Sequence, residues 1–182
     1  MHGLVSILDS KHHKLVESLW QLLEEECGLT GVKVTPFPHF SWLIASDFDW
    51  PALENALREI ASQNNPFTVY TAGLGLFSGP NPVVFIPVVR TAELSTFHQR
   101  VWETIQPLGS EISPLYGPTS WVPHITLAYA DVTPLNIPCV MQTLAFQTYS
   151  WEIRVDNISF INEPDGHVGQ IRSKFELKGS KQ

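Results

Sequence analysis

The sequence is poor in cysteine and has no long apolar run. Its 182 residues include two cysteines, Cys27 and Cys139, whereas a disulfide framework or a structural zinc site needs more ligands at close spacing. No apolar run is long enough to span a membrane, and the N-terminal segment reaches Asp9 without the apolar core of a signal peptide. We therefore expect a reduced, soluble, cytoplasmic protein.

Basic residues are also scarce. The chain has 11 Lys and Arg residues against 18 Asp and Glu residues, which gives a formal net charge of -7. A surface for long nucleic acid needs many contacts from Lys and Arg to phosphates, so we do not expect that class of partner. A small nucleotide or a short oligonucleotide needs only a few donors, and it stays open as a ligand.

Two common signatures of phosphate chemistry are missing. The glycine-rich stretch AGLGLFSGP, residues 72–80, lacks the Gly-Lys-[Ser/Thr] ending of a P-loop. The sequence shows no dense cluster of Asp and His residues, so it does not favour a metallophosphatase. We expect neither a metal nor another cofactor.

Hydrophobic periodicity and the positions of Gly and Pro predict helices and strands in mixed order. The predicted strands are 4–9, 32–45, 67–77, 82–90, 122–130, 150–162 and 167–177. The predicted helices are 10–27, 49–63, 91–109 and a short one near Val140. Turns at 78–81 and 163–166 predict two hairpins. This order favours an α+β fold, with residues 1–182 as one domain of two related lobes and two mainly antiparallel sheets flanking a central cleft.

Two short segments place a histidine and a hydroxyl residue on alternate positions. In TPFPHFSWLIAS, His39 follows a proline and Ser41 comes two positions later. In VPHITLAYA, His124 follows a proline and Thr126 comes two positions later. Side chains alternate across a strand, so each histidine shares a face with its hydroxyl residue. If the two strands face each other across a cleft, two imidazoles and two hydroxyls converge.

That set of groups suits phosphodiester hydrolysis without a metal. A neutral imidazole can take a proton from water, and a protonated imidazole can give one to the leaving oxygen, since histidine titrates near pH 6.5. Hydroxyl groups can donate hydrogen bonds to the non-bridging phosphate oxygens. One histidine on a strand is more often structural, but two matching segments favour catalysis.

The motifs HFSW and HITL resemble the two H-x-[ST]-hydrophobic signatures of the 2H phosphoesterase superfamily. The stretch PHITLAY is similar to the second motif of its 2'-5' RNA ligase-like branch. The resemblance covers nearly the whole chain and implies a bilobal, pseudo-symmetric α+β fold. It also implies hydrolysis of 2',3'-cyclic phosphates or related phosphodiesters without a metal. The implied catalytic residues are His39 and His124, and the implied phosphate-binding residues are Ser41 and Thr126.

The leading interpretation is a metal-independent phosphodiesterase that acts, as a monomer, on a small nucleotide or short oligonucleotide bearing a cyclic phosphate or phosphodiester. A non-catalytic nucleotide-binding module is the alternative from another class, but binding alone requires no acid and base. Activity as a 2'-5' RNA ligase is a further alternative. It is disfavoured by Tyr129, which follows the second motif where RNA-processing members often carry a basic residue. Which histidine is the base stays open.

Several other residues are weaker candidates for the site. We interpret His12 and His13 as solvated, His98 as a residue at a helix boundary, and His167 as a loop residue. Candidates for stacking on a base are Phe37, Tyr116 and Trp121, each of which equally fits a core or loop position. Candidates for a phosphate contact are Arg154, Arg172 and Lys174, for which surface solvation is the simpler role.

Overall fold

The computed structural model of the chain describes residues 2–162 and 167–179. The strands are β1 His2–Ile7, β2 His39–Ala45, β3 Asp47–Phe48, β4 Phe67–Tyr70, β5 Gly75–Phe77, β6 Val83–Pro87, β7 Gly109–Ser110, β8 His124–Ala128, β9 Glu152–Val155, β10 Asn157–Asn162 and β11 Gln170–Glu176. The helices are α1 Ser10–Cys27, α2 Trp50–Gln63, α3 Ala92–Ile105 and α4 Ile137–Leu144, with 3-10 turns at Gly31–Val34, Gln106–Leu108 and Pro114–Tyr116.

The main sheet is antiparallel throughout and has the strand order β11-β10-β1-β2-β8-β6-β5. Its two histidine strands, β2 and β8, are neighbours joined by a single residue pair, Phe40 opposite Ile125. Two small sheets pair β3 with β7 and β4 with β9. The predicted α+β class with antiparallel strands is confirmed, but the two expected main sheets are joined into one seven-stranded sheet because β2 and β8 pair.

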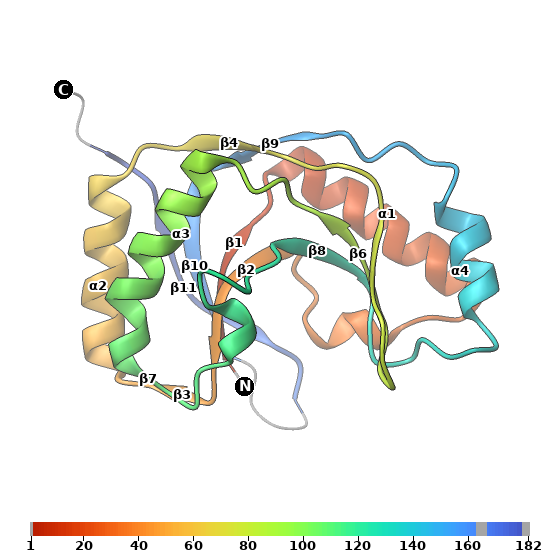
Figure 1. The fold of residues 1–182 in the computed structure, drawn as a ribbon, viewed down its shortest axis with the longest axis horizontal. Helices are drawn as coiled ribbons and strands as arrows, with labels where there is room; N and C mark the ends of the chain where they lie inside the picture. The colour runs from red at the N-terminus through yellow and green to blue at the C-terminus, as the bar shows by residue number, and fades with distance from the viewer. Residues whose placement is uncertain (1, 163–166, 180–182) are drawn as a thin grey trace.

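The helices lie in two pairs at opposite ends of the sheet (Figure 1). Helices α2 and α3 pack together against β10, β11 and β2, whereas α1 packs against β8 and α4 packs on α1. Their apolar side chains share one hydrophobic core with the buried face of the strands. Within the described residues, no helix is both long and apolar enough to cross a bilayer.

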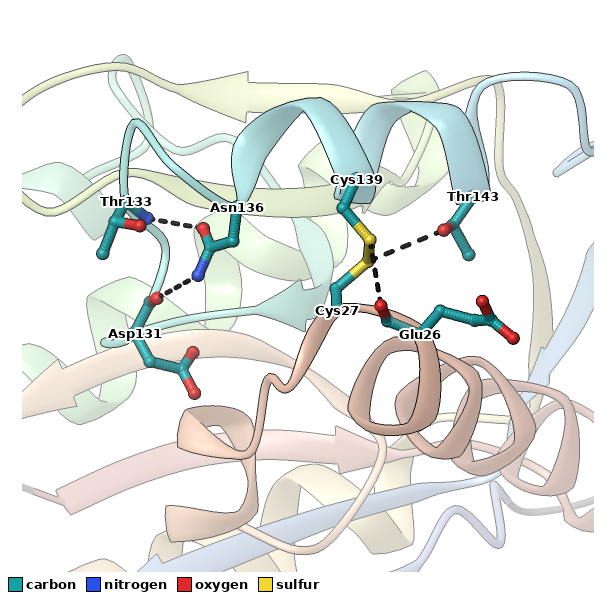
Figure 2. Close-up of a disulfide and its surroundings, with 7 residues drawn as sticks. All are labelled: Glu26, Cys27, Asp131, Thr133, Asn136, Cys139 and Thr143. Atoms are coloured by element: carbon teal, nitrogen blue, oxygen red, sulfur yellow. Dashed lines mark hydrogen bonds between the residues drawn. A yellow bond between two sulfur atoms is a disulfide. The ribbon is translucent and has the colours of Figure 1, made fainter.

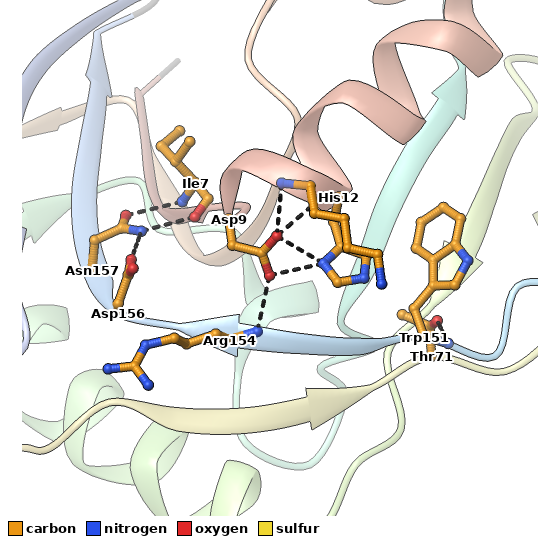
Figure 3. A network of polar contacts seen from close by, with 9 residues as sticks. Ile7, Asp9, His12, Thr71, Trp151, Arg154, Asp156 and Asn157 are labelled. Atoms are coloured by element: carbon orange, nitrogen blue, oxygen red, sulfur yellow. Dashed lines mark hydrogen bonds and ion pairs between the residues drawn. The ribbon is translucent and has the colours of Figure 1, made fainter.

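The carboxylate of Asp9 caps α1 and ties it to β9, as Figure 3 shows. It accepts hydrogen bonds from the backbone N–H groups of Lys11, His12 and Arg154 at 3.0–3.1 Å, and His12 Nδ1 lies 2.8 Å from both of its oxygens. Burial acts to raise the pKa of Asp9, but these contacts lower it overall. His12 is buried and packs 5.6 Å from the Trp151 ring, so the expectation of a solvated His12 is wrong.

The predicted strand 32–45 is extended only from His39 onwards, because its first part forms the 3-10 helix Gly31–Val34. The carboxylate of Asp131 accepts two backbone hydrogen bonds at 2.7 Å where this turn begins. Two prolines follow, and they have no N–H to give to a strand ladder. These prolines are a sequence signal for the break, but the apolar residues that continue across it led to the prediction of one strand.

The predicted strand 150–162 divides into β9 and β10, which belong to different sheets. At the division, the buried Asn157 side chain replaces part of the ladder: it accepts a hydrogen bond from Ile7 N at 3.0 Å and donates one to Ile7 O at 2.8 Å. The predicted strand 67–77 likewise divides into β4 and β5. Strands β5 and β6 form the first predicted hairpin, and β10 and β11 pair as the second requires, although its turn, 163–166, lies outside the described residues.

The expectation of two reduced cysteines is wrong. Cys27 at the end of α1 and Cys139 of α4 form a disulfide, with their Cα atoms 5.8 Å apart (Figure 2). The hydroxyl of Thr143 lies 3.6 Å from the sulfur of Cys27. The cysteines are 112 residues apart in sequence, so no local spacing indicates the pair. They meet because α4 packs on α1.

Candidate active site

The alternation expected for the two histidine strands is present. The residues of the apolar face are buried in the core, namely Phe40, Trp42, Ile125 and Leu127. The residues of the other face are half-buried and line one cavity, namely His39, Ser41, His124 and Thr126. All four candidates from the sequence are therefore brought together.

The seam between β2 and β8 sets how these four side chains lie relative to one another. The strands are antiparallel and Phe40 faces Ile125. In this register, His39 is level with Thr126, and Ser41 is level with His124. Each imidazole thus has the hydroxyl of the opposite strand as its cross-strand neighbour. A phosphate between the imidazoles would have a hydroxyl on either side.

A proline before each histidine shapes how its ring is held. Residues that precede proline favour extended backbone, and in both strands the carbonyl of that residue turns to the histidine ring. The Nδ1 atom of His39 lies 2.5 Å from the carbonyl oxygen of Phe37, and Nδ1 of His124 lies 2.7 Å from that of Val122. A carbonyl can only accept, so Nδ1 of each neutral ring carries the proton. The Nε2 atom of each ring is left as the site that takes up or gives a proton.

Burial lowers the pKa of both imidazoles. The pKa of His39 is lowered to about 4 by burial and by repulsion from His124, against the hydrogen bond to Phe37 that acts to raise it. Burial also lowers the pKa of His124, against its hydrogen bond to Val122. Both rings are therefore neutral at pH 7 in the free protein, and repulsion disfavours a second proton on the pair.

Two tryptophans hold the strand backbone beside the hydroxyl residues. The indole Nε1 of Trp121 donates to the carbonyl of Ser41 at 2.9 Å, and that of Trp20 donates to the carbonyl of Thr126 at 3.0 Å. The pattern is the same on both strands, although Trp20 comes from α1 and Trp121 from the loop before β8. No sequence motif links either tryptophan to the histidines, so the sequence analysis missed this role.

Tyr116 adds a third hydroxyl to the site. It comes from the 3-10 turn Pro114–Tyr116 and lines the cavity, as Ser41 does. Burial raises the pKa of Tyr116 to about 12, against the lowering effect of Ser41. Its phenol thus keeps its proton across the neutral range and can donate a hydrogen bond. The sequence suggested Tyr116 only as a stacking candidate.

The cavity has a volume of about 1190 Å³, which is ample for a nucleotide. Beyond the four candidates it is lined mostly by apolar and hydroxyl side chains, with two further histidines, His2 and His167. Among the described residues no group of three His, Cys, Asp or Glu side chains is placed to hold a metal ion. The described side chains that line the cavity supply groups for proton transfer and hydrogen bonding.

The remaining candidates lie elsewhere or serve packing. Trp121 lines the cavity, but it is buried and stacks on His98 with ring centroids 3.8 Å apart, which makes His98 a core residue and not a boundary one. Phe37 packs against a small apolar cluster of Val5, Ile7 and Ile161. The three proposed phosphate-binding cations do not line the cavity: Arg154, Arg172 and Lys174.

Sequence comparisons match the chain to a known family and to named relatives. Residues 29–167 match the model of the 2'-5' RNA ligase superfamily. A Bacillus cytotoxicus protein named "Putative phosphoesterase" is 25% identical over 126 residues, 69% of each chain. A Bacillus mycoides protein with the same description is 23% identical over 126 residues, again 69% of each chain.

Solved structures share the fold across nearly the whole chain. A crystal structure of a Thermus thermophilus protein superposes with a TM-score of 0.68 at 18% identity, covering 99% of both chains. A structure described as a phosphoesterase gives a TM-score of 0.53 at 13% identity, covering 97% of both chains. Since the family model spans more than half of the sequence, the chain belongs to the 2'-5' RNA ligase superfamily, and the resemblance to the 2H phosphoesterases is confirmed.

Proposed function

We propose that the chain is a metal-independent phosphodiesterase that hydrolyses a 2',3'-cyclic phosphate or a related phosphodiester, with His39 and His124 as its acid–base pair. The supporting observation is the pair of imidazoles that present Nε2 in one cavity, each anchored through Nδ1 to a carbonyl. The names of the relatives as phosphoesterases fit this reaction. We treat residues 1–182 as one domain whose two lobes share this cleft, with a small nucleotide as its ligand.

The proposed reaction is an in-line displacement at phosphorus. One neutral imidazole takes a proton from a water molecule as its oxygen bonds to phosphorus. On the opposite side, the other imidazole, protonated, gives its proton to the leaving ribose oxygen as the P–O bond breaks. The hydroxyls of Ser41 and Thr126 donate hydrogen bonds to the non-bridging oxygens and hold the phosphate between the rings. The products are a phosphomonoester and a free hydroxyl, and the pair has exchanged its protonation states.

The lowered pKa values have a consequence for the pH dependence. The reaction needs one proton on the pair, and both pKa values lie below 6.5 in the free protein. The profile of kcat/KM, which reports the free protein, should therefore peak below pH 6.5. A bound phosphodiester anion favours the charged imidazole, so the profile of kcat should peak at a higher pH than that of kcat/KM.

The deciding experiment is a substrate screen of the purified protein against 2',3'-cyclic nucleotides and 2'-5' oligonucleotides, with and without EDTA. We expect turnover that survives EDTA, because the donor set supplies acid, base and anion contacts without a metal. Turnover that EDTA abolishes and a divalent ion restores would overturn the metal-independent mechanism.

The same screen separates the alternatives. A nucleotide-binding module would bind the ligands without converting any of them. A ligase would use a 5'-hydroxyl end in place of water as the nucleophile and join it to a 2',3'-cyclic phosphate, and the same two histidines could catalyse this step. The family to which the chain belongs is the observation that keeps this second activity in view. Assaying oligonucleotide ends for joining as well as hydrolysis distinguishes the two.

A further inference from the structure

The cavity is nearly free of charged side chains. Lys33 is the single lysine or arginine among the described residues that line it, and no described Asp or Glu lines it. The ammonium of Lys33 forms an ion pair with the carboxylate of Glu24 on α1. Any phosphate in the cavity therefore meets hydroxyls and imidazoles, and one cation that is already paired.

Two arginines that do not line the cavity are held against aromatic rings. The guanidinium of Arg172 lies 3.6 Å from the ring centroid of Trp50. That of Arg90 stacks on Trp121 and donates to the carbonyls of Trp121 at 3.0 Å and Pro118 at 2.8 Å.

Exposed apolar side chains line the cavity, whereas a nucleic-acid site would carry cations. Leu115 is 71% exposed, Val168 54% and Val122 46%, and all three line the cavity. Exposed apolar surface that continues into a pocket is typical of a site for an apolar or aromatic group. These residues are placed to contact the organic part of a ligand whose phosphate lies at the histidines.

The charge of the acid–base pair matches one phosphodiester. The working state of the proposed acid–base pair holds one proton, hence one positive charge, and a phosphodiester carries one negative charge. Each further phosphate would bring another negative charge to a chain of net charge -7, with no unpaired Lys or Arg among the described lining residues to receive it. Proteins that bind nucleic-acid chains gain affinity from such contacts, and this cavity lacks them.

We propose that the substrate is a small phosphodiester with a single negative charge, whose aromatic or alkyl part packs on Leu115, Val122 and Val168, and that additional phosphates weaken binding. This inference rests on the proposed function and narrows its substrate from nucleotides and oligonucleotides to singly charged esters.

The test compares ligands that differ in charge. The series is 2',3'-cyclic AMP, its 5'-phosphate, and a di- and a trinucleotide ending in a 2',3'-cyclic phosphate. We expect the first to have the highest kcat/KM and the 5'-phosphate to lose about fivefold or more through KM, the size of one unfavourable charge contact in water. A kcat/KM that rises with chain length and falls steeply with salt would overturn the inference.

Failure of this charge preference can be distinguished from failure of the proposed function. If no member of the series turned over, the proposed function would fall. The affinities of the same four ligands, measured by calorimetry with the wild-type protein, would still decide the charge preference. Tighter binding of 2',3'-cyclic AMP than of its 5'-phosphate supports the inference, and the reverse order overturns it.

A matched pair of variants tests whether the discrimination against an additional phosphate arises at the cavity. Leu115→Lys puts a cation at the cavity, whereas Leu135→Lys makes the same charge change at a residue that is 93% exposed and outside the cavity lining. Both side chains are exposed, so neither change disturbs the core. We expect Leu115→Lys to improve kcat/KM for the 5'-phosphate relative to 2',3'-cyclic AMP by about fivefold, and Leu135→Lys to leave the ratio unchanged. Equal ratios in the two variants would overturn this placement of the organic part.

Discussion

The two histidine strands are built alike but have different surroundings. In both, a proline precedes the histidine, a carbonyl holds Nδ1, and an indole N–H holds the carbonyl of the hydroxyl residue. Around His124 lie the rings of Phe77 and Phe85, with centroids 4.9 and 5.0 Å from that of the imidazole. The surroundings of His39 lower its pKa to about 4, through burial and through repulsion from His124.

This difference suggests how the pair divides its work. Aromatic rings beside an imidazole favour its cationic form. Repulsion from His124 further disfavours a proton on His39. We therefore expect the first proton to reside on His124, which makes His124 the general acid and His39 the general base of the proposed hydrolysis. Similar backbone geometry thus gives two unlike acids because the side chains around them differ.

The helices that support the two strands differ as well. The β8 side rests on α1 and α4, which the disulfide joins covalently, whereas the β2 side rests on α2 and α3, which are held by packing. The stability of the α1–α4 pair should therefore depend on redox conditions, whereas that of the α2–α3 pair should not.

Loss of either imidazole should have the largest effect. His39→Ala and His124→Ala should each lower kcat about 10²–10⁴-fold with a smaller change in KM, because proton transfer is made only in the transition state. His39→Ala should remove the limb of the pH profile that reports ionisation of the base. His124→Ala should remove the limb that reports ionisation of the acid. His13→Ala, at a histidine outside the cavity, is the control. Near wild-type kcat in either cavity variant would show that the two rings are not the acid–base couple.

The hydroxyl residues should matter less than the imidazoles. Removing one anion donor typically costs about 10²–10³ in kcat, and these half-buried hydroxyls should fall at or below that range. The pKa of Tyr116 is influenced by Ser41, so the two residues interact, and Ser41→Ala combined with Tyr116→Phe should cost less than the sum of the two single changes. Thr126→Ala and Tyr116→Phe should be additive, and Thr126→Ser should restore most of the rate lost in Thr126→Ala. Full additivity of Ser41 with Tyr116 would argue against their coupling.

The site could be predicted from sequence because its signal is local. The alternation of His39 with Ser41, and of His124 with Thr126, lies within a few residues and directly states which side chains share a face. The fold class followed from the order of helices and strands in the same way. The positions of α1, α2 and α3 were also marked locally, by capping residues such as Asp9 and Asp49.

The features that sequence reasoning missed depend on contacts between distant residues. The Cys27–Cys139 disulfide needs α4 to pack on α1, and the break before β10 needs the side chain of Asn157 to bond to Ile7. The role of Trp20 depends on the position of α1 beside β8. None of these pairs has a spacing that a reader of the sequence could recognise.

Breaking the disulfide should cost stability but little activity. It closes a long loop, and such bonds typically contribute about 2–4 kcal/mol to the free energy of unfolding. The double variant Cys27→Ser with Cys139→Ser should therefore unfold at lower urea concentration than the wild type. Its kcat should be unchanged at 25 °C, since neither sulfur lines the cavity. Dithiothreitol should destabilise the wild type and leave the variant unaffected; equal sensitivity of both would mean that the bond contributes nothing.

The smallest expected effect is on the pH dependence of stability, and it tests the difference between the two histidines directly. A histidine whose pKa is lower in the folded state stabilises the fold fully above its unfolded value near 6.5, and this contribution is lost as the pH falls toward the folded value. For His39 that window runs from about 6.5 to about 4, with a slope of at most about 1.4 kcal/mol per pH unit.

His98, whose pKa is lowered by burial to about 4, adds a change of the same sign in every variant. Replacing His39 by glutamine should therefore flatten the fall in unfolding free energy between pH 6.5 and 4.5. The matched change His124→Gln should flatten it less, because we expect His124 to keep the higher pKa of the pair. Urea midpoints at half-unit pH intervals give both slopes. A greater flattening in His124→Gln would reverse the order of protonation, and with it the assignment of His39 as base and His124 as acid.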